Sequence, residues 1–490
     1  MSIRQLFGSP NRRTIISNLF LLPIFIALNC NFIFGQTSDI ATNKQIDAIF
    51  SKYNSKTSGV AVAVLKDGKV VFKKGYGTAN LEYEIPISTK TIFNIASVSK
   101  QFTAFAIYLL EKHGKFSLED DVRKFIPEIP DYGKTIKINH LLAHTSGVRD
   151  QAALMSVAGW RAGEAVTTED ILRVISRQKE LNFEPGTRFL YSNSGYILLA
   201  EIVKRVSGQS FSEFTKKNIF KPLEMNDTQF NDDHERIIKN RAESYELENG
   251  IFKKKALNDS SVGASNLYTT VEDMAKWALN FESPKVGDAE LIRRFNEPSL
   301  LNNGERVVWA ANGDDIGYHA KGQIHWNYRG TKQISHGGHT AAFRSSFWRF
   351  PEQRVAVIVL SNDEHFEQVK NVTEIADLYL KNLKPDLNST SAPATNKTPE
   401  SSNADLKNYE GRFYNDELET VYTAKIVEGK LILFHIRHGE IALNDAGNDK
   451  FTGRIGFPVE IEFIRNENGQ VTGFKISNFG AKNVRFEKMK

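Results

Sequence analysis

Phe93-Asn94-Ile95-Ala96-Ser97-Val98-Ser99-Lys100 places a serine three residues before a lysine, at the predicted start of an apolar helix over 99–113. Positions three apart on a helix share a face, so Ser97 and Lys100 are expected to point the same way. A neutral lysine can take the proton of a serine hydroxyl and create a nucleophile. Burial and the positive end of a helix both lower a lysine pKa and favour that neutral form. The spacing therefore predicts a nucleophile with its base.

This spacing is not specific by itself, because the chain contains a second match at Ser176-Arg177-Gln178-Lys179. That match lies in the charged stretch 169–179, which is typical of the solvated face of an ordinary helix. We therefore assign catalysis only to the first match, on the strength of the motifs that follow it.

The composition is typical of a globular protein, and the net charge argues against a nucleic-acid partner. It has 490 residues, 41% of them hydrophobic and 25% charged, which favours two or three domains of a globular protein. The net charge is +5, and three basic residues lie in an N-terminal leader that contains no acidic residue. Removing the leader brings the net charge to about +2, too little for electrostatic binding of nucleic acid.

The leader itself predicts export. Arg12 and Arg13 precede the short apolar core 15–28, and a small residue, Gly35, stands before Gln36. We expect a signal peptide over 1–35 and a periplasmic or secreted mature protein. An uncleaved membrane anchor is the alternative, and polar residues in and after the core weaken it.

The only cysteine, Cys30, lies inside this leader. A lipid anchor through Cys30 is the less favoured alternative, because Asn29 before it is not the small residue that such sites prefer. Cleavage after Gly35 leaves a mature chain with no cysteine, hence with no disulfide and no thiolate chemistry.

Alternating patterns predict an α+β fold for residues 36–385. After a helix over 43–53, strands at 60–65 and 69–74 meet across Asp67-Gly68, a strong hairpin signal. A second hairpin, 345–350 with 354–360, turns at Pro351-Glu352. The segment between them, 101–281, reads as mainly helical. We expect an antiparallel sheet built from both ends of the domain and flanked by this helical block.

A flexible linker and an all-β module are predicted to follow. Residues 386–405 are rich in serine, threonine, asparagine and proline. Over 406–490, short alternating runs (421–427, 430–436, 459–464, 471–477 and 483–488) indicate a barrel or sandwich. Its histidines, His435 and His438, read as ordinary strand residues. Its aromatic residues are assigned to the core, with a carbohydrate-binding surface and cell-wall contact as the alternative: Tyr409, Phe413, Tyr414, Tyr422 and Phe434.

A second candidate site element is Tyr191-Ser192-Asn193, which enters an apolar helix. The phenol can carry a proton if positive neighbours lower its pKa, and the amide can hold an acyl substrate. The alternative is a loop tyrosine with a capping asparagine.

A third element is His336-Gly337-Gly338-His339, just before the last hairpin of the sheet. Paired glycines suggest backbone close to a ligand, and a strand edge there offers an N–H to an oxyanion. A glycine bulge is the alternative. The segment 141–147 is expected to be structural, with His144 tying a turn beside the site.

In this order and spacing, Ser97-Val98-Ser99-Lys100, Tyr191-Ser192-Asn193 and His336-Gly337-Gly338 resemble the motifs of the serine β-lactamase and penicillin-binding protein superfamily. The resemblance is to its class C-like branch, which includes class C β-lactamases, DD-peptidases, D-aminopeptidases and esterases. It covers about 43–383, and the segments 140–147, 220–225 and 263–267 support it.

The resemblance implies Ser97 as nucleophile, Lys100 as its base and Tyr191 as proton carrier. Asn193 would orient the acyl group, and the backbone N–H groups of Ser97 and His339 would form the oxyanion hole beside His336 and Gly338. It implies acyl transfer through a serine ester with no metal or cofactor, and it likens the C-terminal module to accessory domains that can border the cleft.

One departure concerns the substrate. Many β-lactamases of the branch have a lysine where His336 stands, and a neutral histidine holds a carboxylate less well. We therefore expect hydrolysis of small esters, D-amino-acid peptides or related amides. A β-lactamase proper and a non-catalytic binding or scaffold protein are the alternatives, and the oligomeric state is left open.

Overall fold

The structure, a computed structural model, describes residues 30–312, 315–384 and 406–490. The first 29 residues of the predicted leader and the predicted linker 386–405 lie outside this range, as does the side chain of Cys30. The first helix, α1 (Cys30–Ile49), begins earlier and ends earlier than the predicted 43–53. Within the described ranges, no helix combines the length and apolar character needed to cross a membrane.

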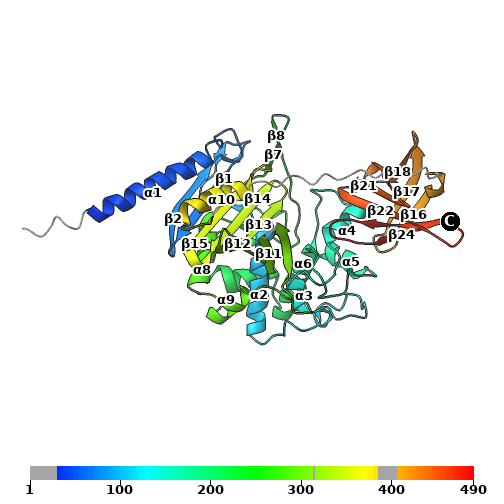
Figure 1. Cartoon of the computed structure of the whole chain (residues 1–490), viewed down its shortest axis with the longest axis horizontal. Helices are drawn as coiled ribbons and strands as arrows, with labels where there is room; N and C mark the ends of the chain where they lie inside the picture. The colour runs from blue at the N-terminus through cyan, green and yellow to red at the C-terminus, as the bar shows by residue number, and fades with distance from the viewer. Residues whose placement is uncertain (1–29, 313–314, 385–405) are drawn as a thin grey trace, which may run out of the picture. The chain divides into compact units, whose positions relative to one another are not determined.

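An eight-stranded antiparallel sheet forms the centre of the catalytic domain, as predicted (Figure 1). Its strands run in the order β10 (Val308–Asn312), β11 (Asp315–Ala320), β12 (Gln323–Tyr328), β13 (Thr331–Thr340), β14 (Phe343–Phe350), β15 (Val355–Ser361), β1 (Val60–Lys66) and β2 (Lys69–Tyr76). The first and last segments of the domain meet where β1 pairs with β15. Both predicted hairpins are confirmed, one turning at Asp67-Gly68 and the other at η4 (Pro351–Gln353).

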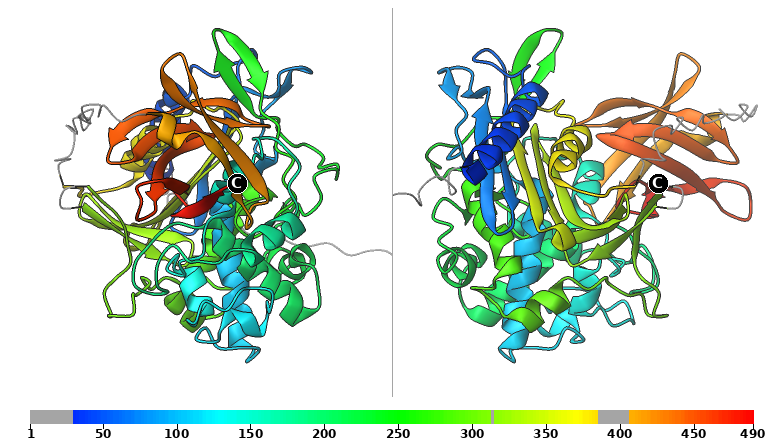
Figure 2. Two further views of the ribbon diagram at one scale, coloured as in Figure 1. Left: turned by 90° about the vertical axis from the view of Figure 1, so that its right-hand side faces the viewer. Right: turned by 60° about the vertical axis from the view of Figure 1, so that its left-hand side comes forward.

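Helices cover both faces of the sheet. Every residue of β15 is buried, which requires cover on each side. Alternate residues of β1 and β15, such as Ala63 and Ile358, belong to the main core with α8 (Val271–Glu282). Helix α10 (Gln368–Tyr379) packs on β14 and β15 (Figure 2).

The predicted helical block is also present. It comprises α2 (Lys100–Lys112), α3 (Ile138–Leu142), α4 (Gln151–Val157), α5 (Thr168–Ser176), α6 (Asn193–Ser207), α7 (Phe211–Thr215) and α8, with short helical turns η2 (Val122–Lys124) and η3 (Lys216–Phe220). The turn η1 (Ala96–Ser99) precedes the predicted block, and α9 (Ala289–Phe295) follows it. Short strands form three further small sheets: β3 (Thr78–Asn80) with β4 (Ile85–Pro86), β5 (Phe93–Asn94) and β6 (Gln229–Phe230) with β9 (Leu267–Thr269), and β7 (Tyr245–Glu248) with β8 (Ile251–Lys254).

The C-terminal module is a single nine-stranded antiparallel sheet curled into a nearly closed barrel. After η5 (Leu406–Tyr409), its strands are β16 (Gly411–Asn415), β17 (Thr420–Val427), β18 (Lys430–His435), β19 (Gly439–Ala442), β20 (Asn444–Gly447), β21 (Lys450–Ile455), β22 (Phe457–Arg465), β23 (Val471–Ser477) and β24 (Val484–Lys488). The two ends of the sheet approach each other where β19 contacts β21. Of the two predicted architectures, the barrel is therefore the one formed.

The core of the barrel includes part of the catalytic domain. Ala153, Leu154 and Val157 of α4 belong to the same buried cluster as the barrel's own aromatic residues. Tyr409, Phe413 and Tyr422 are buried in that cluster as predicted, whereas Tyr414 and Phe434 are more than a third exposed. Contact between the module and a cell wall stays a prediction.

Candidate active site

The nucleophile candidate lies on a tight turn between β5 and α2. Ser97 is in η1, and the preceding Ala96 has a positive φ of 47°, a conformation that costs energy in a non-glycine residue. Neighbouring segments hold the turn: the side chain of Asn94 accepts the Ala96 N–H at 2.8 Å, and Ser345 Oγ donates to the Ile95 carbonyl at 2.7 Å. The serine is thus presented by a strained, well-supported loop.

The predicted i, i+3 geometry brings Lys100 to Ser97. Lys100 Nζ lies 3.1 Å from Ser97 Oγ, 2.8 Å from Asn193 Oδ1 and 2.8 Å from the Ala264 carbonyl. An ammonium uses all three contacts as donor. A neutral amine keeps two N–H bonds, to Asn193 and Ala264, and aims its lone pair at the Ser97 hydroxyl.

Burial favours that neutral amine. Lys100 is fully buried, and its desolvation lowers its pKa to about 7, against the opposing attraction of the Asp150 carboxylate. A lysine in this position is partly neutral near pH 7 and can accept a proton from Ser97.

Tyr191 also contacts the serine. Its hydroxyl donates to Ser97 Oγ at 2.9 Å, and the Lys100 Nζ lies 4.8 Å from the centre of its ring. The condition that positive neighbours lower its pKa is not met, because burial raises the Tyr191 pKa. Tyr191 is therefore a neutral phenol, a proton donor in the resting site, while Lys100 is the group poised to accept a proton.

Strand β13 lies beside the turn that carries Ser97. It pairs with β12 as far as Ser335, and beyond that point η1 packs against it. A Cβ at Gly338 would lie 2.3 Å from the Ile95 carbonyl oxygen and 2.3 Å from Ser345 Oγ, so only glycine permits this approach. At Gly337 the nearest such atom is 3.7 Å away. Gly338 therefore serves close packing of β13 on the nucleophile turn.

The two histidines around these glycines differ. His336 is buried, and its Nδ1 lies 2.5 Å from the Gly337 carbonyl, which can only accept; Nδ1 must carry the proton. Burial lowers the His336 pKa to about 4, so the ring is neutral at pH 7 as expected. The side chain of His339 is 62% exposed and lies 3.6 Å from Glu364.

Sequence reasoning missed several residues of this site. Asp150 and the carbonyl of Ala264 carried no signal of their own, although each lies in or next to a quoted segment. Trp309 packs edge-on against Tyr191 at 5.4 Å, and the buried His319 lies 4.9 Å from His144. His144 is structural as predicted: its Nδ1 accepts the Ser192 N–H at 3.1 Å.

Within the residues that the structure describes, no three histidine, cysteine, aspartate or glutamate side chains come together as a group that could hold a metal ion. His435 lies in β18 as predicted and bonds to Thr420, whereas His438 lies in the turn before β19, not in a strand, and bonds to the Ser156 carbonyl.

Comparison with known proteins places the chain in a family. Residues 46–380 match the Beta-lactamase family, so the chain belongs to it. Penicillin-binding protein 4* of Bacillus subtilis is 29% identical over 339 residues, which cover 66% of this chain and 72% of that protein. D-aminopeptidase of Gluconobacter oxydans is 28% identical over 321 residues, covering 65% of this chain and 58% of that protein. The chain is accordingly a serine hydrolase related to penicillin-binding proteins and D-aminopeptidase.

Solved structures share its fold. The octameric penicillin-binding protein homologue from Pyrococcus abyssi has a TM-score of 0.61 and 24% identity, over 91% of this chain and 99% of that one. D-amino acid amidase from Ochrobactrum anthropi SV3 has a TM-score of 0.57 and 21% identity, over 69% and 97% of the two chains. At these identities, the likeness concerns the fold alone.

Proposed function

We propose that this chain is an exported serine hydrolase that forms an acyl-enzyme on Ser97, with small esters, D-amino-acid peptides or related amides as substrates. The observation that carries the proposal is the convergence of Lys100 Nζ and the Tyr191 hydroxyl on Ser97 Oγ, at 3.1 and 2.9 Å. The names of the relatives, D-aminopeptidase among them, support the substrate class.

In the proposed reaction, neutral Lys100 takes the Ser97 proton as Oγ attacks the substrate carbonyl carbon. The backbone N–H groups of Ser97 and His339 hold the oxyanion. Tyr191 gives its phenolic proton to the leaving nitrogen or oxygen, and the proton held by Lys100 replaces it. Water then attacks the ester through the same groups in reverse, and Ser97 is regenerated.

The state of His336 argues against a carboxylate-bearing antibiotic as the preferred substrate. The ring is neutral, its Nδ1 proton is directed to Gly337, and its Nε2 is left as a lone pair. The group therefore offers a carboxylate neither a positive charge nor a second donor. Hydrolysis of β-lactams remains the alternative function.

The test is the intact mass of the protein after mixing with a penicillin or an activated ester, with Ser97→Ala in parallel. We expect an adduct of acyl mass that Ser97→Ala lacks, together with turnover of D-aminoacyl amides or esters. Rapid consumption of the penicillin would instead favour the β-lactamase. Retained turnover in Ser97→Ala would refute the assignment, and a protein inert toward all three probes would support a scaffold.

Export is tested separately, by expressing the full chain and sequencing the N-terminus of the extracytoplasmic product. A start at Gln36 supports the signal peptide. A product that begins at residue 30 and carries lipid would support the anchor at Cys30 in its place.

A further inference from the structure

Asp150 connects helix α4 to the candidate active site. Its Oδ1 accepts the N–H groups of Ala152 and Ala153 at 2.9 and 3.3 Å, which caps α4. Its Oδ2 accepts two donors from Asn193, the backbone N–H at 2.6 Å and Nδ2 at 3.1 Å. The carboxylate is completely buried, and these bonds, together with the nearby charge of Lys100, compensate for its lost water.

This bond determines how the Asn193 amide points. Because Nδ2 donates to the Asp150 carboxylate, Oδ1 is turned toward Lys100 Nζ, 2.8 Å away. The reverse orientation would aim two acceptors at each other on one side and two donors on the other. Asp150 therefore sets the orientation of Asn193, and Asn193 sets one of the three contacts of Lys100.

The C-terminal module holds the main chain at Asp150. The Asp150 N–H donates to the carbonyl of Gly480, in the turn between β23 and β24, at 2.8 Å. Asn182 braces the same turn, donating to the Gly480 carbonyl at 2.9 Å and accepting the Lys482 N–H at 2.8 Å. A Cβ at Gly480 would lie 2.5 Å from the Cβ of Asp150, so a glycine is required at this contact.

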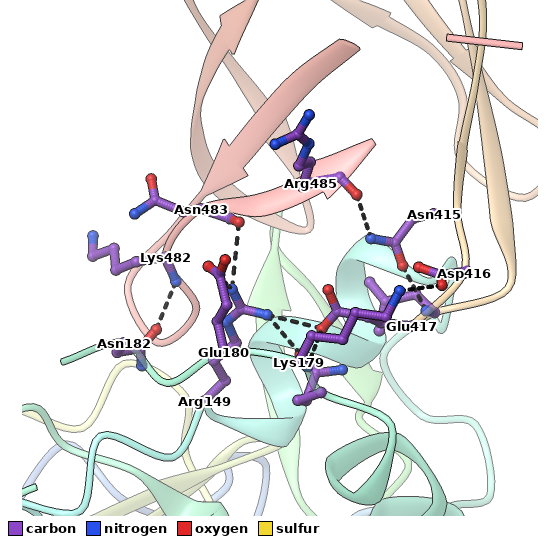
Figure 3. Close-up of polar contacts among 12 residues, drawn as sticks. Arg149, Lys179, Glu180, Asn182, Asn415, Asp416, Glu417, Lys482, Asn483 and Arg485 are labelled. Carbon is purple, nitrogen blue, oxygen red and sulfur yellow. Dashed lines mark hydrogen bonds and ion pairs between the residues drawn. The ribbon is translucent and has the colours of Figure 1, made fainter. Parts of the chain in front are cut away.

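The residue before Asp150 is held by the module as well (Figure 3). The guanidinium of Arg149, 1% exposed, donates to Glu417 at 3.0 Å and to the Asn483 carbonyl at 3.3 Å. Glu417 lies between β16 and β17 and also accepts the Lys179 N–H at 3.0 Å. Two separate turns of the module, between β16 and β17 and between β23 and β24, thus form hydrogen bonds with the consecutive residues Arg149 and Asp150.

The charge of Asp150 also affects the pKa of Lys100. Facing Lys100 are the rings of Tyr191 and Tyr196, and three buried histidines whose pKa values its charge lowers: His144, His319 and His336. Among the residues that the structure describes, Asp150 is the anion whose charge acts on Lys100, and it opposes the effect of burial on the lysine pKa. Neutral tyrosines and neutral histidines supply no comparable charge.

We propose that Asp150 is a positioning residue for acyl transfer and that the C-terminal module is the part of the fold that fixes it. The turn at Gly480 holds the Asp150 main chain, Asp150 orients Asn193, and Asn193 with the Asp150 charge positions Lys100 against Ser97. The proposal rests on the proposed function of Ser97 and Lys100.

The first test is the pH dependence of kcat/KM for the full chain and for Asp150→Asn. Removing the anion lowers the Lys100 pKa further, so the acid limb is expected to move to lower pH by on the order of one unit. We also expect kcat to fall at least about tenfold while KM changes less, since Asn193 loses its orientation. A purely structural role would change the melting temperature and the height of the kcat/KM profile but would leave its acid limb at the same pH. That result would overturn the proposal.

The second test concerns the module. Gly480→Ala pushes on Asp150 and is expected to lower kcat at least about tenfold. Gly453→Ala is the matched control: it lies in the same module, and its added methyl would lie 3.0 Å from Leu443 Cδ2, the far end of a flexible side chain, and no nearer than 3.4 Å to the Ala442 carbonyl oxygen and 3.5 Å to Ile441 Cγ2. Equal activity of the two variants would overturn the role of the module.

Two further variants keep the result interpretable. If Gly480→Ala does not fold, Asn182→Asp removes the donor to Gly480 with little change of shape, and it is expected to lower kcat in the same direction. An unchanged kcat in Asn182→Asp then counts against the proposal. Ser97→Ala distinguishes failure of the proposed function from failure of the positioning role of Asp150. If Ser97→Ala keeps activity, the proposed function fails. If Ser97→Ala is inactive but the acid limb of the kcat/KM profile does not move in Asp150→Asn, only the positioning role of Asp150 is overturned.

Discussion

At the scale of single residues, the site depends on protonation states that burial creates. Burial lowers the pKa of Lys100 to about 7 and raises that of Tyr191, so a base and an acid contact the same serine. The two pKa values move in opposite directions because desolvation disfavours the charged form of each group, the ammonium of one and the phenolate of the other.

A pH profile tests this assignment. Lys100 must be neutral to accept the Ser97 proton, so kcat/KM is expected to rise with pH through about 7 and to level off above it. The measurement is kcat/KM for an activated ester from pH 5 to 9, on enzyme shown to stay folded. Lys100→Arg, which cannot lose its proton, is expected to be inactive. A limb near pH 4 would identify His336 as the base and contradict the assignment.

At the scale of elements, the site is formed where β13 closes on η1. The strand carries the His-Gly-Gly segment past the nucleophile, and Ser345 of the neighbouring β14 bonds to the Ile95 carbonyl. The close approach depends on the missing side chain of Gly338, whereas Gly337 has room around it.

Adjacent glycines therefore provide a matched pair of variants. Gly338→Ala is expected to force β13 away from Ser97 and to lower the acylation rate at least about tenfold, since packing errors of about 1 Å are costly in an active site. Gly337→Ala is expected to cost several-fold less. The acylation rate is followed by stopped-flow absorbance with an activated ester, and circular dichroism checks folding. Similar losses in both variants would show that the close contact at Gly338 has no special role.

At the scale of the whole molecule, the catalytic domain and the module share buried structure. Helix α4 contributes Ala153, Leu154 and Val157 to the barrel core, and the barrel contributes Glu417 to the buried Arg149 pair. The charged stretch 169–179 was predicted to be a solvated helix face. In the structure most of its charged residues are exposed, as predicted, and Arg173 and Arg177 pair with Glu419 of the module at that surface. Deleting residues 406–490 would expose the apolar face of α4, and point variants test the module more cleanly.

Two acidic residues of the turn between β16 and β17, Glu417 and Glu419, differ in their expected contribution to stability. Glu417→Ala leaves the buried Arg149 without its main charge partner and is expected to lower the free energy of unfolding by about 3–5 kcal/mol. Glu419→Ala removes the surface ion pairs that its 45% exposed side chain makes with Arg173 and Arg177, and it is expected to cost only a small fraction of that. Urea unfolding followed by fluorescence measures both, with a single transition expected because the core is shared. Equal losses would contradict the buried role of Glu417.

The sequence alone determined the parts of this protein that depend on local pattern. Hairpins at Asp67-Gly68 and Pro351-Glu352, the helix after Ser97 and most strands of the module follow from turn residues and alternation, which act over a few residues. The ordered motifs also identified the family, because the i, i+3 spacing of Ser97 and Lys100 is a local constraint.

Only the tertiary structure decided the rest. Ala264 lies 164 residues from Lys100 along the chain, and Gly480 lies 330 residues from Asp150, so no local pattern announces either contact. The direction of the Tyr191 pKa likewise depends on burial, which is set by the packing of distant segments and which the sequence pattern left undetermined. The same holds for the attachment of the barrel to α4, where two cores predicted as separate are joined by a helix that buries its apolar face in the other domain.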